Sequence, residues 1–313
     1  MEFPLVSIIV PTFNYGHFLK ETINSVLNQT YKNIECIIVD DGSTDNTSFL
    51  VAEFSSNSLI KYFYKPNGGL SSARNYGIQH STGSYLIFLD ADDLLSPRKI
   101  ELNISFLLQN TSVDIVYNNA YYFNDSQPDV YFNNIYLGQT KWMSNISGSG
   151  LKMIEQLVDA NFLPINAVMI SKASVNRIGN FKNSLKAVED WDYWFRAALY
   201  GINFSFDLHP DAYALIRVHA NSMSKSVLNQ KRAEIKMRKR YAASITNYSS
   251  DFVIHKEYLM KVNWLKINFL EMRYFNIFKT VPEIFFYLIR SNKKLQVTTN
   301  ICKALFKRLF KLI

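Results

Sequence analysis

Four short apolar segments alternate with amphipathic segments along the first hundred residues. The apolar segments are rich in β-branched and aromatic side chains, end in turn residues and cover 5–11, 35–41, 59–65 and 84–90. Runs of this kind are typical of strands that are buried on both faces of a parallel sheet. Strands that alternate with helices at this interval predict an α/β fold, in which a mostly parallel sheet is flanked by helices.

Helical spacing marks three segments between and after these strands. Their apolar positions are Leu19, Ile23, Val26 and Leu27, then Phe49 and Ala52, then Ile100, Ile104, Leu107 and Leu108. Ser43 or Thr44 is expected to cap the second helix. Ser96 followed by Pro97 marks the start of the third helix.

The pattern changes twice further along the chain. After about residue 112 it loosens into strand-like runs and loops, and residues 231–313 hold 18 Lys and Arg against 5 Asp and Glu. This asymmetry suggests two parts with different partners. The predicted parts are an α/β domain over 1–225, with halves at about 1–112 and 113–225, and a helical basic extension over 226–313.

Composition narrows the class of protein. The chain has 313 residues, of which 48% are hydrophobic, as in folded globular proteins. Cys36 and Cys302 are too few for a disulfide framework, which favours a reducing compartment. The start of the chain carries Glu2 and no basic leader, so we expect no secretory signal. The apolar run at 284–289 ends at Arg290 and is too short to span a bilayer.

Carboxylates follow two of the predicted strands. Asp40 and Asp41 end the second, and Asp90, Asp92 and Asp93 end the fourth. In an open parallel sheet, ligands bind at the carboxyl ends of the strands. Carboxylate oxygens suit Mg²⁺ or Mn²⁺ bound to phosphates, whereas a single Asp can also be a helix cap. For the Asp-x-Asp pair we favour metal binding.

Two common nucleotide sites are disfavoured by the turn after the first strand. A dinucleotide fold requires Gly-x-Gly-x-x-Gly there, and a P-loop requires a glycine-rich Lys-Ser/Thr motif. The chain has neither, since this turn reads VPTFNYGHF. Sugar nucleotidyltransferases are disfavoured for the same reason, because they need a glycine-rich basic loop at this point.

Five ordered motifs point to one family. They read VSIIVPTFN, SVLNQTYKNIECIIVDDGSTDNT, NGGLSSARNYGI, GSYLIFLDADD and EDWDYWFRAALYG. Over roughly residues 4–222, the chain resembles the family 2 glycosyltransferases of the GT-A fold. The resemblance implies a nucleotide-diphosphate-sugar donor, with a UDP-sugar as first choice, and transfer with inversion. It further implies a hydroxyl of a saccharide or polyprenyl-linked saccharide as acceptor, in O-antigen or capsule biosynthesis.

The resemblance also implies roles for individual residues in the first half of the domain. Those expected at the donor are Pro11, Thr12, Phe13, Asn14, Asp40, Asp41, Asn67, Gly68, Arg74, Asp90 and Ala91. Phe13 would lie beside the base, and Asp41 would hydrogen-bond it with support from Asp40. Three alternatives stay open: Phe13 as a core residue, Arg74 as an exposed helix residue and Asp40 as purely structural.

The metal and the base are implied in the same way. Asp92 would bind Mn²⁺ or Mg²⁺, together with Asp90 and with His219 from the segment LIRVHANSMS. The resemblance makes Asp190 the catalytic base, with Glu189 shaping the acceptor side. Acidic residues in a first helical turn are also favoured by the helix dipole, so each has a plain structural alternative. Helical geometry turns Asp192 away from Asp190.

The last eleven residues suggest a location in the cell. The segment KALFKRLFKLI places Leu and Phe on one side and Lys and Arg on the other, as in helices that lie on anionic membranes. A helix packed on the domain and a nucleic-acid surface are the alternatives. We expect a cytoplasmic protein, peripheral on the inner face of the cell membrane, with no nucleic acid as partner. The alternative function is a catalytically inactive nucleotide-sugar-binding paralogue.

Overall fold

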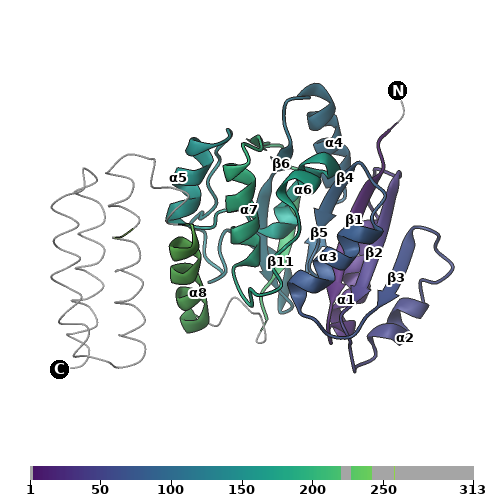
Figure 1. Ribbon diagram of the computed structural model, residues 1–313. Coiled ribbons are helices and arrows are strands. Elements are labelled where there is room, and N and C mark those ends of the chain that lie inside the picture. Colours follow the sequence, from purple (N-terminus) through teal and green to yellow (C-terminus); the bar gives the residue numbers. More distant parts are fainter. Residues whose placement is uncertain (1–2, 220–226, 242–256, 258–313) are drawn as a thin grey trace, which may run out of the picture. The chain divides into compact units, whose positions relative to one another are not determined.

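The computed structural model describes residues 3–219, 227–241 and 257 (Figure 1). The chain divides into two compact units, Met1–Ser222 and Met223–Ile313. In the second unit, helix α8 (Val227–Arg240) is basic in its last turn. The segment 303–313, on which the membrane prediction depends, lies outside the described residues. Within the described part of the chain, we find no helix that is long and apolar enough to cross a membrane.

A seven-stranded sheet forms the centre of the first unit, in the order β10-β6-β9-β4-β1-β2-β3. Its strands are β1 (Val6–Thr12), β2 (Ile34–Asp40), β3 (Ile60–Tyr64), β4 (Tyr85–Phe88), β6 (Ile115–Tyr117), β9 (Val168–Ser171) and β10 (Phe204–Phe206). All neighbours are parallel except β9, which is antiparallel to both β4 and β6. The predicted α/β fold with a mostly parallel sheet is therefore confirmed.

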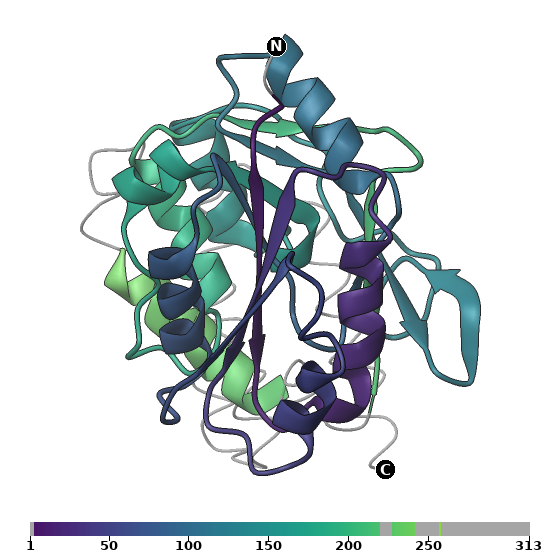
Figure 2. The same ribbon diagram turned by 90° about the vertical axis from the view of Figure 1, so that its right-hand side faces the viewer.

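Helices cover both faces of this sheet. Figure 2 shows α1 (Gly16–Leu27) and α3 (Leu70–His80) on opposite sides of β1. Side chains at alternate positions of β1, such as Ile8, pack in one buried cluster with α1 and α4 (Lys99–Gln109). On the other face, α3 approaches β1 closely, since a Cβ added to Gly77 would lie 2.3 Å from Ile9 Cγ2. Both faces being buried explains why these strands read as continuous apolar runs.

A second sheet of four strands has the order β5-β11-β7-β8. Its members are β5 (Leu94–Leu95), β7 (Asn119–Asn124), β8 (Gln127–Phe132) and β11 (Tyr213–Arg217). The remaining helices of the first unit are α2 (Thr47–Ala52), α5 (Leu151–Asp159), the 3-10 helix η1 (Ile165–Ala167), α6 (Lys172–Ile178) and α7 (Glu189–Leu199). Strand β5 directly follows residues 90–93, which hold Asp90, Asp92 and Asp93 and are called the carboxylate turn below, so this sheet adjoins the expected site.

Three helix predictions need correction. Ser43 and Thr44 do not cap α2, because Ser43 Oγ instead accepts the backbone N–H of Asn14 at 2.9 Å. The helix begins at Thr47, whose N–H donates to Asp45 Oδ1 at 3.0 Å. In α4, Leu108 is 46% exposed, although Ile100, Ile104 and Leu107 are buried as predicted. In α2, Phe49 is 74% exposed and Ala52 is exposed as well, because this short helix buries Thr47 and Val51 instead.

Candidate active site

The end of β1 is tied to the loop that follows β2. Asn14 has a φ of 57°, a left-handed conformation that asparagine tolerates better than most residues. Its Oδ1 accepts the N–H groups of Thr44 at 2.7 Å and Asp45 at 3.3 Å. Pro11 and Thr12 are buried in β1, whereas Phe13 is 45% exposed, so Phe13 is not a core residue. Its ring is open to contact with a ligand.

The two carboxylates after β2 organise the neighbouring loops. Asp41 Oδ2 accepts the N–H of Gly69 at 2.6 Å and its Oδ1 that of Gly68 at 3.0 Å, and Lys65 Nζ forms an ion pair with it. Asp41 therefore holds the turn of residues 67–69 over the end of the sheet. Asp40 accepts bonds from Ser43 N and Tyr62 Oη, both at 2.7 Å, which favours a structural role.

The carboxylate turn after β4 is held by two buried residues, Asn166 and Arg217. On one side, Asn166 Oδ1 accepts the N–H of Asp90 at 2.9 Å, and Asn166 Nδ2 donates to Asp93. On the other side, the N–H of Arg217 donates to Asp93 Oδ1 at 2.8 Å. Burial, followed by the charges of Asp92 and Asp90, raises the pKa of Asp93 well above its usual value. Asp93 is thus the buried anchor of the turn.

Asp92 and His219 meet at this turn. Their Oδ2 and Nε2 atoms are 2.9 Å apart, and Phe18 packs on the imidazole with ring centroids 4.9 Å apart. Burial and the nearby charge of Asp90 raise the pKa of Asp92, although the hydrogen bond from His219 opposes the shift. A carboxylate oxygen and an imidazole nitrogen form a donor set that fits Mn²⁺.

Asp90 is oriented differently. Its Oδ1 accepts a bond from Arg74 Nη2 at 2.7 Å, so this oxygen faces a cation supplied by the chain. Among the described residues, no group of three or more His, Cys, Asp or Glu side chains is arranged to hold a metal ion. The structure therefore brings Asp92 and His219 together, while the participation of Asp90 as a ligand stays a prediction.

Arg74 bridges the two parts of the site. It is 1% exposed, and its Nη1 donates to Glu189 Oε1 at 2.8 Å while Nη2 binds Asp90. Burial disfavours the charged guanidinium, yet Asp90 and Glu189 outweigh this penalty and raise its pKa. The alternative of an exposed helix residue is wrong. Direct contact with a donor stays a prediction, because both terminal nitrogens are already bound to carboxylates.

Asp190 lies in the first turn of α7, next to Glu189. Its Oδ2 accepts a bond from Asn161 Nδ2 at 2.8 Å, and its Oδ1 accepts the N–H of Trp191 at 2.7 Å. Burial and the negative charge of Glu189 raise the pKa of Asp190 to about 7, although Arg74 and these hydrogen bonds lower it. A carboxylate with a pKa near neutrality is suited to general-base catalysis.

Asp192 faces away from this site, as predicted. It is fully buried and pairs with Arg196 at 2.9 Å and with Lys182 at 3.5 Å. These contacts belong to the packing of α7 and not to the carboxylates around Asp190.

Three residues of the site were not expected from the sequence. Asn161, Asn166 and Arg217 carry no motif of their own, and each acts through a partner that is distant along the chain. The one available signal was the position of Arg217, two residues before His219 in the same segment.

Fold and site together define a class of protein. The carboxyl ends of β1 and β4 carry an exposed aromatic ring and a carboxylate turn. The segment after β11 adds a histidine to this turn, and the first turn of α7 supplies a carboxylate suited to act as a base. This arrangement is typical of group-transfer enzymes of the open α/β type. The sequence model of glycosyl transferase family 2 matches residues 7–175, and the chain belongs to this family. The protein is a glycosyltransferase.

Curated relatives agree with this assignment. An uncharacterized glycosyltransferase of Rickettsia typhi is 36% identical over 230 residues, which cover 72% of this chain and 68% of the relative. An uncharacterized glycosyltransferase of Rickettsia conorii is 34% identical, but only 36% of its length is matched. WfgD of Escherichia coli, a UDP-Glc:alpha-D-GlcNAc-diphosphoundecaprenol beta-1,3-glucosyltransferase, is 38% identical over 40% of this chain and 49% of its own.

Solved structures share the fold. Residues 1–349 of TarS from S. aureus, in complex with UDP-GlcNAc, align with a TM-score of 0.62 at 21% identity, over 84% of this chain and 72% of that chain. The mannosyltransferase PcManGT from Pyrobaculum calidifontis, in complex with GDP-Man and Mn²⁺, aligns with a TM-score of 0.61 at 19% identity, over 99% of this chain and 81% of that chain. At these identities the likeness concerns the fold alone.

Proposed function

We propose that this protein is an inverting glycosyltransferase that moves a sugar from a nucleotide-diphosphate sugar, with a UDP-sugar as first choice, to a hydroxyl of a saccharide or lipid-linked saccharide. The observation that carries the proposal is the pair of carboxylate sites joined by Arg74. Asp190, with a pKa of about 7, lies on one side, and the turn that holds Asp92 lies on the other. One site suits proton removal and the other suits a leaving diphosphate.

The donor would lie over the ends of β1 and β2. Phe13 offers an exposed ring to the base, and the turn of residues 67–69, held by Asp41, would close beside the diphosphate. The structures of TarS with UDP-GlcNAc and of PcManGT with GDP-Man, which share this fold, make a nucleotide sugar the natural candidate.

Asp92 and His219 would hold Mn²⁺ or Mg²⁺, with Asp90 as a further ligand. A divalent cation at this turn supplies charge stabilisation to the departing diphosphate. Burial, followed by the charge of Asp90, raises the pKa of Asp92, and a bound cation would relieve the repulsion between these two carboxylates. The donor set and its charge therefore fit the cation.

Asp190 would act on the acceptor. The acceptor hydroxyl gives its proton to the Asp190 carboxylate while its oxygen forms the bond to the anomeric carbon, and the bond from that carbon to the diphosphate breaks. A single displacement from the face opposite the leaving group inverts the configuration. Glu189, held by its ion pair with Arg74, would keep the pKa of Asp190 raised through its negative charge without contacting the proton itself.

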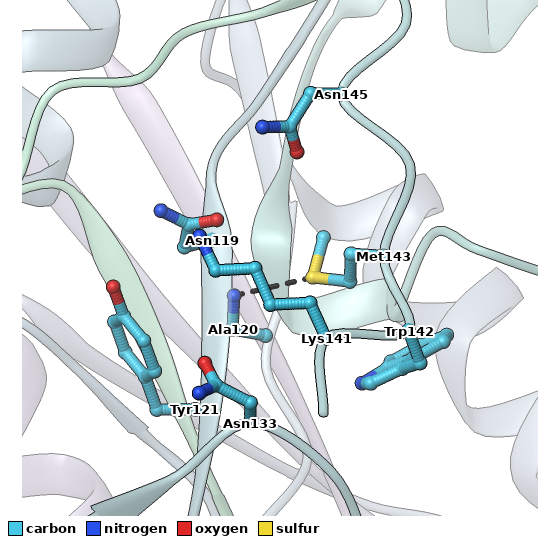
Figure 3. A pocket seen from close by; sticks show the side chains of 8 residues that line it. All are labelled: Asn119, Ala120, Tyr121, Asn133, Lys141, Trp142, Met143 and Asn145. Atoms are coloured by element: carbon cyan, nitrogen blue, oxygen red, sulfur yellow. Dashed lines mark hydrogen bonds between the residues drawn. The ribbon is translucent and has the colours of Figure 1, made fainter. Parts of the chain in front are cut away.

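The acceptor would approach from the second half of the domain. Figure 3 shows a pocket beside the start of β7, lined by the polar side chains of Asn119, Asn133, Lys141 and Asn145 and by the ring of Trp142, among others. Amide and aromatic side chains of this kind suit sugar hydroxyls and sugar faces. A lipid-linked saccharide of a surface polysaccharide is the acceptor we favour, in line with the diphosphoundecaprenol-linked acceptor of WfgD.

The extension over 226–313 would keep the enzyme on the inner face of the cell membrane through its basic residues. An inactive nucleotide-sugar-binding protein is the second candidate. Asp190 separates the two, because binding without turnover does not need a base, and the alternative predicts equal behaviour of wild type and Asp190→Asn.

The experiment that tests the proposal is release of nucleoside diphosphate from UDP-, GDP- and dTDP-sugars, with Mn²⁺ and with chelator. We expect nucleoside diphosphate to be released from one donor, and we expect this release to require metal and to be lost in Asp92→Ala. Lack of release from every donor, with lipid-linked acceptors supplied, would favour the binding protein.

A further inference from the structure

Arg217, the last residue of β11, is buried against the carboxylate turn. It is 4% exposed, and its backbone N–H donates to Asp93 Oδ1 at 2.8 Å. Its side-chain Nε donates to the carbonyl oxygen of Asp92 at 2.9 Å. Backbone and side chain of one residue thus bind two successive residues of the turn.

Aromatic rings and acidic side chains hold the guanidinium in place. Its carbon lies 4.8 Å from the ring centroid of Phe18 and 4.6 Å from that of Phe123. Nη2 pairs with Glu21 at 2.5 Å, and Nη1 pairs with Asp125. The group therefore connects α1, β7 and the carboxylate turn to the end of β11.

The guanidinium donors of Arg217 bind two kinds of partner, exposed carboxylates and a buried carbonyl oxygen. The two acidic partners keep more than half of their side-chain surface exposed, at 61% for Glu21 and 57% for Asp125, and each could be solvated by water. The Nε–H instead binds the buried side of the turn. Only a planar group with several fixed donors can stack between rings and reach a carbonyl and two carboxylates, so a lysine would not replace it.

The position of His219 follows from the same residue. It comes two residues after Arg217, packs on Phe18, and meets Asp92 at 2.9 Å. The residue that fixes the peptide of Asp92 thus also begins the segment that carries the histidine. A shift of Arg217 would move both members of the pair.

We propose that Arg217 is a positioning residue for the cation site of this enzyme: it fixes the Asp92 peptide so that the Asp92 carboxylate and the His219 imidazole converge on one ion. This inference rests on the proposed function. It assigns Arg217 no contact with donor or acceptor and no role in proton transfer. The residue acts through the carboxylate turn and through the segment that carries His219.

The test measures Mn²⁺ binding by calorimetry with UDP present, in the full chain. For Arg217→Lys we expect the dissociation constant for Mn²⁺ to rise about 10- to 100-fold, as is usual when a residue that orients a metal ligand is changed. UDP affinity in chelator should stay within about twofold of wild type. A merely structural role would lower both affinities, or neither.

Arg98→Lys is the matched control. Arg98 is half exposed and pairs with Asp211 at 3.0 Å, so the same change of chemistry is made outside the site. Mn²⁺ binding by this variant should equal that of wild type. Equal weakening in both lysine variants would overturn the inference.

The double variant Glu21→Gln with Asp125→Asn guards against a misfolded Arg217→Lys. Both side chains are exposed, and the change leaves Arg217 in place without its anionic partners. We expect a smaller rise of the Mn²⁺ dissociation constant, about 3- to 10-fold, because Arg217 loses its anionic partners but keeps its bond to the carbonyl oxygen of Asp92. If Arg217→Lys and the double variant both bound Mn²⁺ as tightly as wild type, the positioning role of Arg217 would be refuted and the proposed metal role would not. Absence of Mn²⁺ binding by the wild type would refute the metal role proposed above, and this inference with it.

Discussion

Replacing Asp190 by asparagine should change how the stability of the protein depends on pH. Burial and the charge of Glu189 raise the pKa of Asp190 from 3.8 to about 7 in the folded state. Between these values the folded chain holds a proton that the unfolded chain has released, so stability falls as pH rises. The loss is complete above the folded pKa. Asparagine carries no charge and has no such loss.

The size of the effect follows from the shift. Each pH unit between the two pKa values changes the free energy of unfolding by about 1.4 kcal/mol. Two of these units lie between pH 5 and pH 7, which gives an upper figure of about 3 kcal/mol between pH 5 and pH 9. The Asp190 side chain is only partly buried, so about 1 to 3 kcal/mol is the expected range.

The assay is urea unfolding of wild type and Asp190→Asn at several pH values from 5 to 9. The free energy of unfolding of the variant, minus that of wild type, should increase with pH and level off above about pH 8. Asp129→Asn, which changes an exposed side chain on β8, serves as the control and should follow the wild-type curve. A difference that is constant between pH 5 and pH 9 would refute the raised pKa and, with it, the electrostatic argument that Asp190 is suited to act as the base.

Three further predictions concern other parts of the chain. Arg74→Met leaves Asp90 and Glu189 without their common cation, and it should lower stability by about 3 to 5 kcal/mol in the same urea assay; a loss below about 1 kcal/mol would contradict the bridging role. Gly77→Ala brings a methyl group to 2.3 Å from Ile9 and should cost about 1 to 3 kcal/mol, seen as a lower melting temperature, whereas an unchanged melting temperature would mean that α3 can move off β1. Phe13→Ala removes an exposed ring, so stability should change by less than about 0.5 kcal/mol while the donor KM rises several-fold; an unchanged KM would argue against stacking on the base.

The sequence predicted the parts of the fold that depend on local patterns. The apolar runs at 5–11 and 35–41 became β1 and β2 with shifts of one residue at each end, because strands buried on both faces leave a continuous signal. The cap of α2 was missed since Ser43 is used by Asn14, a contact between loops that are 29 residues apart. The exposure of Leu108 likewise depends on where α4 meets the sheet, which periodicity alone does not give.

The candidate site divides in the same way. Asp92, Asp190 and His219 lie in motifs, and the sequence could point to them. Asn166 and Arg217 hold the carboxylate turn through contacts that span 73 and 124 positions. Such contacts join segments that are far apart along the chain and exist only in the folded protein, so no local pattern reports them. The burial of Arg74 is of the same kind, because Glu189, one of its partners, is 115 residues away.

The central claim is that Asp190 removes the proton of the acceptor while other residues bind the donor. The measurement that tests it most directly compares Asp190→Asn with wild type, once the donor is known, in donor binding and in turnover with acceptor. The account predicts an unchanged donor dissociation constant and a kcat lower by about 100-fold or more, as is typical for the loss of a general base. Turnover equal to that of wild type would contradict the account.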